Sequence, residues 1–217
     1  MTDIYTTEKR YSIIYADPPW RYYTYSKKGL GRSAESHYRT MSKEKIQALP
    51  VPRISAKNSV LFLWATSPCL IEAFQLIEAW GYTYKTVGFT WLKQCRKSDK
   101  LFMGMGYYTR ANAEYCLLAT KGRILERKSH SILSAIISPI REHSRKPEEV
   151  RERIVKLFGE LPRIELFAGR SKVLSRIAAT SIHTENHITN VTNKESKLCN
   201  IYGTILLYFT SRLRKLG

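Results

Sequence analysis

Short apolar runs, separated by polar segments that contain glycine or proline, make up most of the first 170 residues. A run that is rich in β-branched or aromatic residues and stops abruptly, as residues 11–16 stop at Asp17-Pro18-Pro19, predicts a strand. Strands are predicted in this way at residues 11–16, 59–65, 82–92, 114–120, 134–137 and 163–167. The first two runs are almost wholly apolar, which is typical of strands buried on both faces of a sheet.

Three helices are predicted between these strands. Ser42 can cap a short helix that ends before Pro50. Thr66 and Ser67 can cap a second helix, which ends at Gly81 and places five apolar side chains on one face: Leu70, Ala73, Phe74, Ile77 and Trp80. A third helix is predicted at residues 148–158. Strands that alternate with helices favour an α/β fold, with a mostly parallel sheet flanked by helices.

Three segments fall outside this pattern. Residues 21–38 are aromatic and basic with two glycines, and residues 93–112 are polar and glycine-rich, so both are interpreted as loops. Residues 171–217 form a tail that is rich in Ser, Thr and Asn up to position 200 and then carries one apolar run, at 201–209. Nine apolar residues are too few to span a bilayer.

Composition and charge narrow the class of protein. The 217 residues are 43% hydrophobic and carry 36 Lys and Arg against 18 Asp and Glu, a net charge of +18. Such a charge favours a polyanionic partner such as nucleic acid. The four cysteines form no CxxC pair and the histidines show no metal spacing, so no metal site is expected. We expect a soluble, intracellular protein with no membrane span.

Asp17-Pro18-Pro19-Trp20, directly after the first predicted strand, is the sharpest chemical signal. The exocyclic amine of adenine is a poor nucleophile because its lone pair is delocalised into the ring. The Asp17 carboxylate and the Pro18 carbonyl could accept both amine hydrogens, with no backbone donor at either proline to compete. Trp20 could stack on the base. The alternative is a strand-ending turn with a packed tryptophan.

The segment Tyr15-Ala16-Asp17-Pro18-Pro19-Trp20-Arg21 resembles the opening motif of the β-class adenine amino-methyltransferases. This family includes the mRNA adenosine methyltransferase catalytic subunit and its bacterial and phage DNA relatives. The resemblance runs in order from about Tyr11 to Arg170 through His37-Tyr38-Arg39-Thr40-Met41-Ser42, Leu61-Phe62-Leu63-Trp64, Trp80-Gly81-Tyr82, Trp91-Leu92-Lys93, Asn112-x-Glu114-x-Cys116-Leu117-Leu118, Lys121-Gly122, Arg141, Ser144-Arg145-Lys146-Pro147-Glu148-Glu149 and Ile164-Glu165-Leu166-Phe167.

The resemblance implies a Rossmann-like methyltransferase domain at residues 1–170 that binds S-adenosylmethionine and methylates the adenine amine. Asp17, Pro18, Pro19 and Trp20 would be the catalytic motif. By the same match, Lys121 would lie near the methionine carboxylate or the target base, Glu165 near the ribose hydroxyls and Phe167 against the cofactor's adenine. The full set implied to bind the cofactor is Ala16, Asp17, Lys121, Glu165, Leu166, Phe167 and Arg170. As plain structural residues, Lys121 and Glu165 would be surface charges and Phe167 core.

The chain departs from the family after Phe167. Relatives read Glu-Leu-Phe-Ala-Arg or Glu-Leu-Phe-Gly-Arg, whereas this chain reads Ala168-Gly169-Arg170 after Glu-Leu-Phe and so has one extra residue. The family's Gly-Trp…Gly-Asn segment does not follow. Residues 171–217 are therefore interpreted as an atypical tail, either disordered or produced by a coding frameshift, or as a lineage-specific extension. Either origin places the cofactor site in question.

Basic and aromatic residues gather in the two predicted loops. Residues 85–128 hold ten Lys and Arg against three acidic residues. Such a run can be a solvated surface, but beside a proposed active site it indicates a nucleic-acid interface whose target base leaves its stack. The residues expected to contact the substrate are Trp20, Tyr22, Tyr38, Lys93, Arg110 and Arg141.

The hypothesis that follows is S-adenosylmethionine-dependent methylation of adenine N6 in DNA, in the cytoplasm of a bacterium or a phage-infected host. An RNA adenosine methyltransferase is the first alternative. The second alternative is a catalytically inactive relative that binds nucleic acid, and it is suggested by the atypical tail.

Overall fold

The computed structural model of the chain describes residues 3–21, 40–141 and 145–167. The chain divides into two units, residues 1–176 and 177–217, and every described residue belongs to the first. The predictions for Tyr22, Tyr38, Arg170 and the tail from residue 171 therefore lie outside the described residues.

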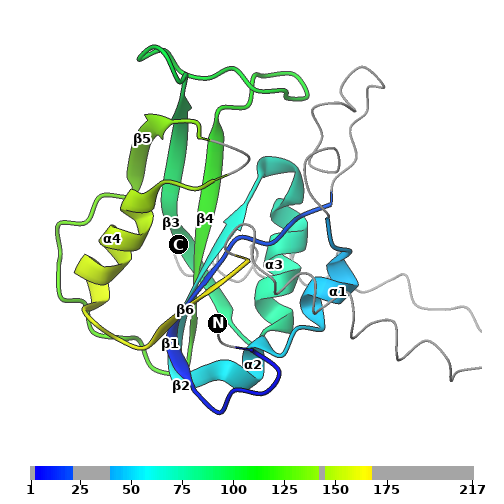
Figure 1. Cartoon of the computed structure of the whole chain (residues 1–217), viewed down its shortest axis with the longest axis vertical. Coiled ribbons are helices and arrows are strands. Elements are labelled where there is room, and N and C mark those ends of the chain that lie inside the picture. Colours follow the sequence, from blue (N-terminus) through cyan, green and yellow to red (C-terminus); the bar gives the residue numbers. More distant parts are fainter. Residues whose placement is uncertain (1–2, 22–39, 142–144, 168–217) are drawn as a thin grey trace, which may run out of the picture. The chain divides into compact units, whose positions relative to one another are not determined.

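In the part of the chain that the structure describes, six strands form one sheet in the order β5-β3-β4-β2-β1-β6 (Figure 1). Their bounds are β1 (Tyr11–Ala16), β2 (Ser55–Ala65), β3 (Thr83–Gln94), β4 (Ala113–Lys121), β5 (Ala135–Pro139) and β6 (Arg163–Leu166). All six lie where the apolar runs predict them. The second begins four residues earlier than expected, because the strand also includes the less apolar segment Ser55-Ala56-Lys57-Asn58.

The sheet is mixed, which corrects the simpler prediction of a mostly parallel one. The pairs β1–β2, β1–β6 and β3–β5 are parallel, whereas β4 runs antiparallel to both of its neighbours, β2 and β3. The physical reason is the connection between β3 and β4. Residues 95–112 contain no helix, and without a helical crossover the chain turns back antiparallel. The broader prediction of an α/β fold is confirmed.

The helices are α1 (Lys43–Gln47), α2 (Val51–Ile54), the 3-10 turn η3 (Ser67–Cys69), α3 (Leu70–Ala79) and α4 (Glu148–Phe158). Ser42 caps α1 as predicted, accepting a hydrogen bond from the Lys45 amide at 3.4 Å. The α2 turn was not predicted. The prediction ends helical structure at Pro50 and Pro52. A proline in the first turn of a helix lacks only an amide that has no helical partner, so a new helix begins there instead.

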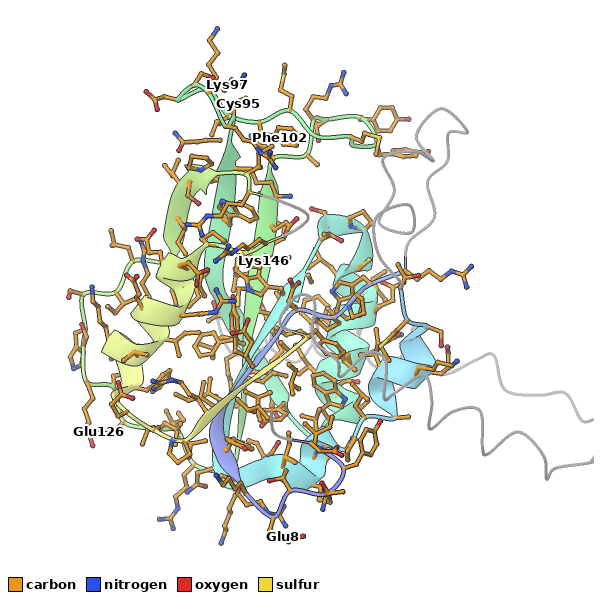
Figure 2. All side chains as sticks on the ribbon, viewed as in Figure 1. Glu8, Cys95, Lys97, Phe102, Glu126 and Lys146 are labelled. Carbon is orange, nitrogen blue, oxygen red and sulfur yellow. The ribbon has the colours of Figure 1, made fainter. Side chains whose placement is uncertain are left out.

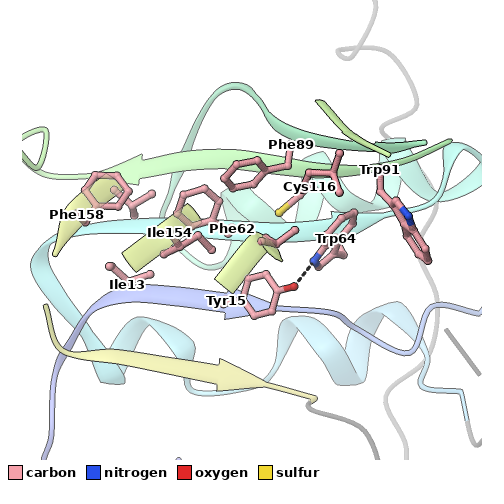
Figure 3. Close-up of a cluster of buried hydrophobic side chains, with 12 residues drawn as sticks. Ile13, Tyr15, Phe62, Trp64, Phe89, Trp91, Cys116, Ile154 and Phe158 are labelled. Atoms are coloured by element: carbon pink, nitrogen blue, oxygen red, sulfur yellow. Dashed lines mark hydrogen bonds between the residues drawn. The ribbon is translucent and has the colours of Figure 1, made fainter. Parts of the chain in front are cut away.

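Helices cover both faces of the sheet (Figure 1). On one face α4 inserts Val150, Ile154 and Phe158 into a cluster of sheet side chains that includes Phe62 and Trp64 (Figure 3). On the other face lie α1 and α3, joined by a hydrogen bond from the Trp80 indole to the Ile46 carbonyl at 3.3 Å.

The buried face of α3 differs from the prediction at two positions, the first of which is Leu70, which is only half-buried. Phe74 is exposed and makes an edge contact with Tyr84 of β3, with ring centroids 4.9 Å apart, while Leu76 is buried in its place. Among the described residues, no helix is long and apolar enough to cross a membrane.

The antiparallel direction of β4 sets which residues share an edge of the sheet. Ala16, at the end of β1, pairs with Leu63, and Ala65, at the end of β2, pairs with Tyr115 near the start of β4. The edge formed by the ends of β1 and β2 and the start of β4 is called the site edge below. The last residue of β4, Lys121, pairs with Ser59 and lies toward the opposite edge.

Candidate active site

Asp17 follows β1 directly, at the site edge. Its amide donates a hydrogen bond to the Leu166 carbonyl at 3.4 Å, so β6 fixes the backbone just past the strand. The carboxylate stays 28% exposed, and its Oδ2 accepts a hydrogen bond from Lys146 Nζ at 2.8 Å. Lys146 therefore holds the Asp17 carboxylate in place on one side, while part of the carboxylate remains exposed to solvent.

The contact between Asp17 and Lys146 belongs to a row of four charged side chains in which acidic and basic residues alternate. Lys146 also pairs with Glu114 Oε2 at 3.3 Å, and Glu114 in turn pairs with Lys93 through its other oxygen, Oε1. Lys146 is only 7% exposed and Glu114 is buried. The two lysines also lie near aromatic rings, since Lys146 is 5.6 Å from the centroid of Trp64 and Lys93 is 5.2 Å from that of Trp91. We call Asp17, Lys146, Glu114 and Lys93 the charge chain.

The pKa values in the charge chain follow from burial and pairing. Burial raises the pKa of Asp17, and Lys146 offsets this only in part. For Glu114, burial acts in the same direction, but Lys146 and Lys93 outweigh it and hold the pKa below its usual value. Burial opposes the charge of Lys146, yet Asp17 and Glu114 raise its pKa above the ordinary range. The two acidic partners thus hold Lys146 in its charged form, while burial raises the pKa of Asp17 and the two lysines lower that of Glu114.

The turn after Asp17 is held by its own backbone and by two tryptophans. The Trp20 amide donates to the Pro18 carbonyl at 2.8 Å, and the Met41 amide donates to the Pro19 carbonyl at 3.0 Å. The prolines have no amide of their own, as expected, but the Trp20 amide occupies one acceptor position of the Pro18 carbonyl. A carbonyl has two lone pairs, so one acceptor position at Pro18 remains.

Trp20 is fixed rather than free to rotate. Its indole Nε1 donates to the Trp64 carbonyl at 2.9 Å, and the side chain is 7% exposed. The structure thus makes Trp20 a wall of the site that joins the turn to β2. Little of the ring is left open for stacking on a base.

Beside β1, the last strand brings the predicted cofactor residues to the same edge. Ala16 and Leu166 pair with each other and are buried, so their backbones rather than their side chains face the site edge. Glu165 accepts two hydrogen bonds from Arg151 of α4, at 2.9 and 2.5 Å, and this contact raises the pKa of Arg151 above its usual value. Phe167 has a positive φ of 65°, which turns the chain sharply where β6 ends.

Other predicted site residues are not brought to Asp17. Lys121 lies four register positions beyond Leu117, which is opposite Leu63, a separation of about 13 Å along the strand. This placement contradicts a role for Lys121 beside the catalytic motif. Arg110 is exposed in the β3–β4 connection, and Arg141 is exposed, with its guanidinium 3.7 Å from Glu148.

Lys146, Glu114 and Arg151 are the residues that sequence reasoning did not assign to the site. Glu114 and Lys146 both lie in segments that resemble the family, but the resemblance was used to assign Lys121, and not these two residues, to the site. Arg151 carried no signal beyond its place in a helix. Within the described ranges, no group of three His, Cys, Asp or Glu could hold a metal ion.

Comparison with known proteins bears on the same residues. Residues 11–182 match the MT-A70 family model. The chain belongs to the MT-A70 family. The match begins at the first residue of β1 and includes every described residue of the charge chain. It confirms the predicted family and extends twelve residues beyond Arg170.

Three relatives of this MT-A70 chain represent two kinds of protein. The Type II methyltransferase M.MunI of Mycoplasma sp is 36% identical over 176 residues, which cover 74% of this chain and 72% of the relative. A probable N(6)-adenosine-methyltransferase MT-A70-like protein of Oryza sativa is 27% identical, and the human N(6)-adenosine-methyltransferase catalytic subunit METTL3 is 24% identical. The chain spans only 21% and 25% of the last two proteins.

Proposed function

We propose that this MT-A70 chain transfers a methyl group from S-adenosylmethionine to the exocyclic N6 amine of adenine in DNA. The observation that carries the proposal is the partly exposed Asp17 carboxylate, fixed by Lys146 at the end of β1 and directly followed by the Pro18 carbonyl. Membership in a methyltransferase family, and relatives named for N(6)-adenosine methylation, support the reaction.

The chemistry asked of Asp17 and Pro18 is to hold both amine hydrogens. Adenine N6 is planar and weakly nucleophilic, and two acceptors placed on its hydrogens favour the tetrahedral geometry of the transition state. Asp17 supplies a carboxylate oxygen, and Pro18 supplies the lone pair that Trp20 leaves. Acceptors fixed before the reaction cost no reorganisation during it, which is the main source of such rate gains.

The rest of the charge chain keeps Asp17 ready for this task. Burial raises the pKa of Asp17 and so favours its protonated form, and a proton would remove an acceptor position. Lys146 counteracts the protonation and fixes the carboxylate at 2.8 Å. Glu114 orients Lys146 from the other side and is itself oriented by Lys93. Lys146, Glu114 and Lys93 are in this account positioning residues.

The side chains at the site edge fit S-adenosylmethionine by their chemistry. The cofactor carries a positively charged sulfonium, which the partly exposed Asp17 carboxylate would attract, whereas Lys146 is buried between two carboxylates and acts through Asp17. The cofactor's ribose hydroxyls suit Glu165, because each Glu165 oxygen bonded to Arg151 keeps a further acceptor position. When bound, the cofactor would supply the electrophilic methyl group: the N6–C bond would form as the S–C bond breaks, S-adenosylhomocysteine would leave, and N6 would give up one proton to solvent. We place Ala16, Leu166, Phe167 and Arg170 in the same Rossmann-like cofactor site.

The choice of DNA rests on the comparison with M.MunI. This Type II methyltransferase is matched over 72% of its length at 36% identity, whereas the N(6)-adenosine methyltransferases are matched over about a quarter or less. RNA is the second candidate, because those relatives are named for adenosine. A DNA substrate implies the cytoplasm of a bacterium or of a phage-infected cell as the place of action. Tyr22, Tyr38, Lys93, Arg110 and Arg141 remain our candidates for substrate contact.

The test is methyl transfer from labelled S-adenosylmethionine to amplified DNA and to transcribed RNA of the same sequence. Neither polymer carries N6-methyladenine beforehand, so hydrolysis and mass analysis of the product identify the methylated atom. We expect label in N6-methyladenine from DNA, at least tenfold above RNA. Label mainly in RNA would select the second candidate. Binding of DNA with no transfer to either polymer would assign the chain to the inactive relatives.

The variant Asp17→Asn removes the carboxylate that the proposal requires and should lose transfer to DNA. Its matched control is Glu126→Gln, which makes the same change at an exposed carboxylate that lies away from Lys146 in Figure 2. This variant should methylate as the unchanged chain does. Loss of transfer in Glu126→Gln would show that removal of any carboxylate is enough, and the assignment of Asp17 would then fail.

A further inference from the structure

The connection between β3 and β4, residues 95–112, forms a structured arm rather than a loose loop. The Phe102 amide donates to the Lys93 carbonyl at 2.8 Å and the Gly104 amide to the Ala111 carbonyl at 2.8 Å, so the chain doubles back twice. A hydrogen bond from Arg96 Nη2 to the Arg141 carbonyl, at 2.8 Å, ties the arm to the segment after β5. Figures 1 and 2 show the arm beyond the ends of β3 and β4.

Two glycines let the end of the arm close tightly. A Cβ on Gly104 would overlap the Ala111 carbonyl, and a Cβ on Gly106 would overlap the Thr109 carbonyl. The turn that they permit consists of residues 106–109 and has Tyr107 and Tyr108 at its centre. The absence of a side chain at these two glycines thus allows the tight turn that exposes Tyr107 and Tyr108 at the tip of the arm.

The arm exposes an unusual amount of apolar surface. Tyr108 is 95% exposed and Tyr107 is 78% exposed, and their rings meet edge to face with centroids 4.9 Å apart. Behind them, Leu101, Met103 and Met105 are also exposed. Residues two apart in an extended chain share a face, so these three side chains continue toward the tip as one apolar stripe.

Charge complementarity indicates what this stripe meets. The arm carries four basic residues, Arg96, Lys97, Lys100 and Arg110, against one acidic residue, Asp99. A basic segment with exposed aromatics matches a nucleic acid, whose phosphates attract the cations and whose bases stack on the rings. An apolar protein partner would gain nothing from the four cations.

The arm also begins beside the catalytic motif. Its base lies between Lys93, near the end of β3, and Glu114, near the start of β4, and both belong to the charge chain that ends at Asp17. From Ala113 to Tyr108 the chain runs five residues, a reach of at most about 16 Å. A duplex whose adenine enters the site would therefore pass within reach of the tip.

We propose that the arm is a wedge that inserts Tyr107 and Tyr108 into a DNA duplex and thereby releases the target adenine from its stack. The proposal rests on the proposed function and deepens it, because it specifies paired DNA as the substrate form. An adenine in a duplex cannot reach Asp17 without leaving the helix, and the unstacking is costly. Apolar side chains inserted at a base step offset that cost by replacing the lost stacking.

The test compares methyl transfer to one amplified DNA, offered as a duplex and as its separated strands. The variant Tyr107→Ser/Tyr108→Ser removes the rings, and Tyr107→Phe/Tyr108→Phe keeps them. Tyr5→Ser changes an exposed tyrosine outside the arm and is the matched control. All variants are made in the full chain, and their affinity for both DNA forms is measured by fluorescence anisotropy.

We expect the serine variant to lose about tenfold or more of its kcat/KM on duplex, the scale of one stacked base, and less than twofold on single strands. The phenylalanine variant and Tyr5→Ser should retain both activities. Equal losses on the two DNA forms, or no loss on either, would overturn the wedge. Self-association that the serine variant abolishes would assign the tip to a protein contact and overturn it as well.

The affinity measurement separates this proposal from the proposed function. If the unchanged chain transfers no methyl group but binds duplex tightly, and the serine variant loses duplex affinity selectively, the wedge stands and the proposed reaction fails. If the chain methylates DNA and the tyrosines make no difference to the ratio of duplex to single-strand activity, the reaction stands and the wedge fails.

Discussion

Lys146 is the residue on which the arrangement of the site depends most. It is almost fully buried and pairs with two carboxylates, Asp17 at 2.8 Å and Glu114 at 3.3 Å. The substitution Lys146→Met keeps the length and apolar contacts of the side chain but removes its charge. Asp17 and Glu114 would then face each other at the site edge without the cation between them.

The size of the effect can be estimated from these distances. With an effective dielectric constant of about 20, the two contacts correspond to gross attractions of about 6 and about 5 kcal/mol. Desolvation of Lys146, Glu114 and the partly buried Asp17 offsets much of this, and removing one partner of a buried pair costs about 3–5 kcal/mol. We therefore expect Lys146→Met to lower the free energy of unfolding by about 3–5 kcal/mol at pH 8.

The loss should depend on pH in one direction. In the unchanged chain the pKa of Glu114 is lowered, so its stabilising contribution is present above the ordinary carboxyl pKa and is lost as pH falls. Without Lys146 the pKa values of Glu114 and Asp17 rise, and that destabilisation disappears as both groups are protonated. The difference between variant and unchanged chain should therefore shrink from pH 8 to pH 5.

The assay is urea unfolding followed by circular dichroism at several pH values. Lys156→Met removes an exposed lysine from α4 and serves as the control, with an expected change of about 0.5 kcal/mol or less. Lys146→Arg keeps the charge and should retain more stability than Lys146→Met. A loss below about 1 kcal/mol for Lys146→Met, or one that does not change with pH, would refute the reasoning.

Three further predictions concern other contacts. Trp20→Phe leaves the Trp64 carbonyl without its indole donor and should lower the free energy of unfolding by about 1–3 kcal/mol in urea; an unchanged value would contradict the fixed indole. Arg151→Gln frees Glu165 and should weaken S-adenosylmethionine binding in calorimetry more than Arg153→Gln on the same helix does; equal affinities would contradict this role. Gly106→Ala should speed trypsin cleavage at Arg110, because the new Cβ would open the tip; an unchanged rate would contradict the tight turn.

The order and limits of the elements could be predicted because each depends on local chemistry. The prolines after Asp17 end β1 at the predicted residue, and Ser42 caps α1 as its side chain allows. The direction of β4 could not be predicted in the same way. Nothing in the apolar run 113–121 states which way the strand points, and that direction decides that Glu114, rather than Lys121, lies at the site edge.

The site shows the same division. Asp17 was predicted because proline, tryptophan and a strand end adjoin it in sequence, and the structure holds it open at the edge of the sheet. Lys146 lies in a segment that resembles the family, but its contact with Asp17 joins residues 129 positions apart along the chain, and only the fold brings them together. The hydrogen bond from the Trp20 amide to the Pro18 carbonyl was not predicted either. It joins residues only two positions apart, and no pattern of side chains along the sequence reveals it.

The central claim is that the Asp17 carboxylate holds the amine of the target adenine during methyl transfer. The most direct measurement is the single-turnover rate of transfer from labelled S-adenosylmethionine to amplified DNA by Asp17→Asn, with Glu126→Gln as control. Loss of one fixed, oriented group of this kind costs about a hundredfold to a thousandfold in rate, so we expect Asp17→Asn to fall by at least a hundredfold while the control is unchanged. A rate for Asp17→Asn within tenfold of the unchanged chain would contradict the claim.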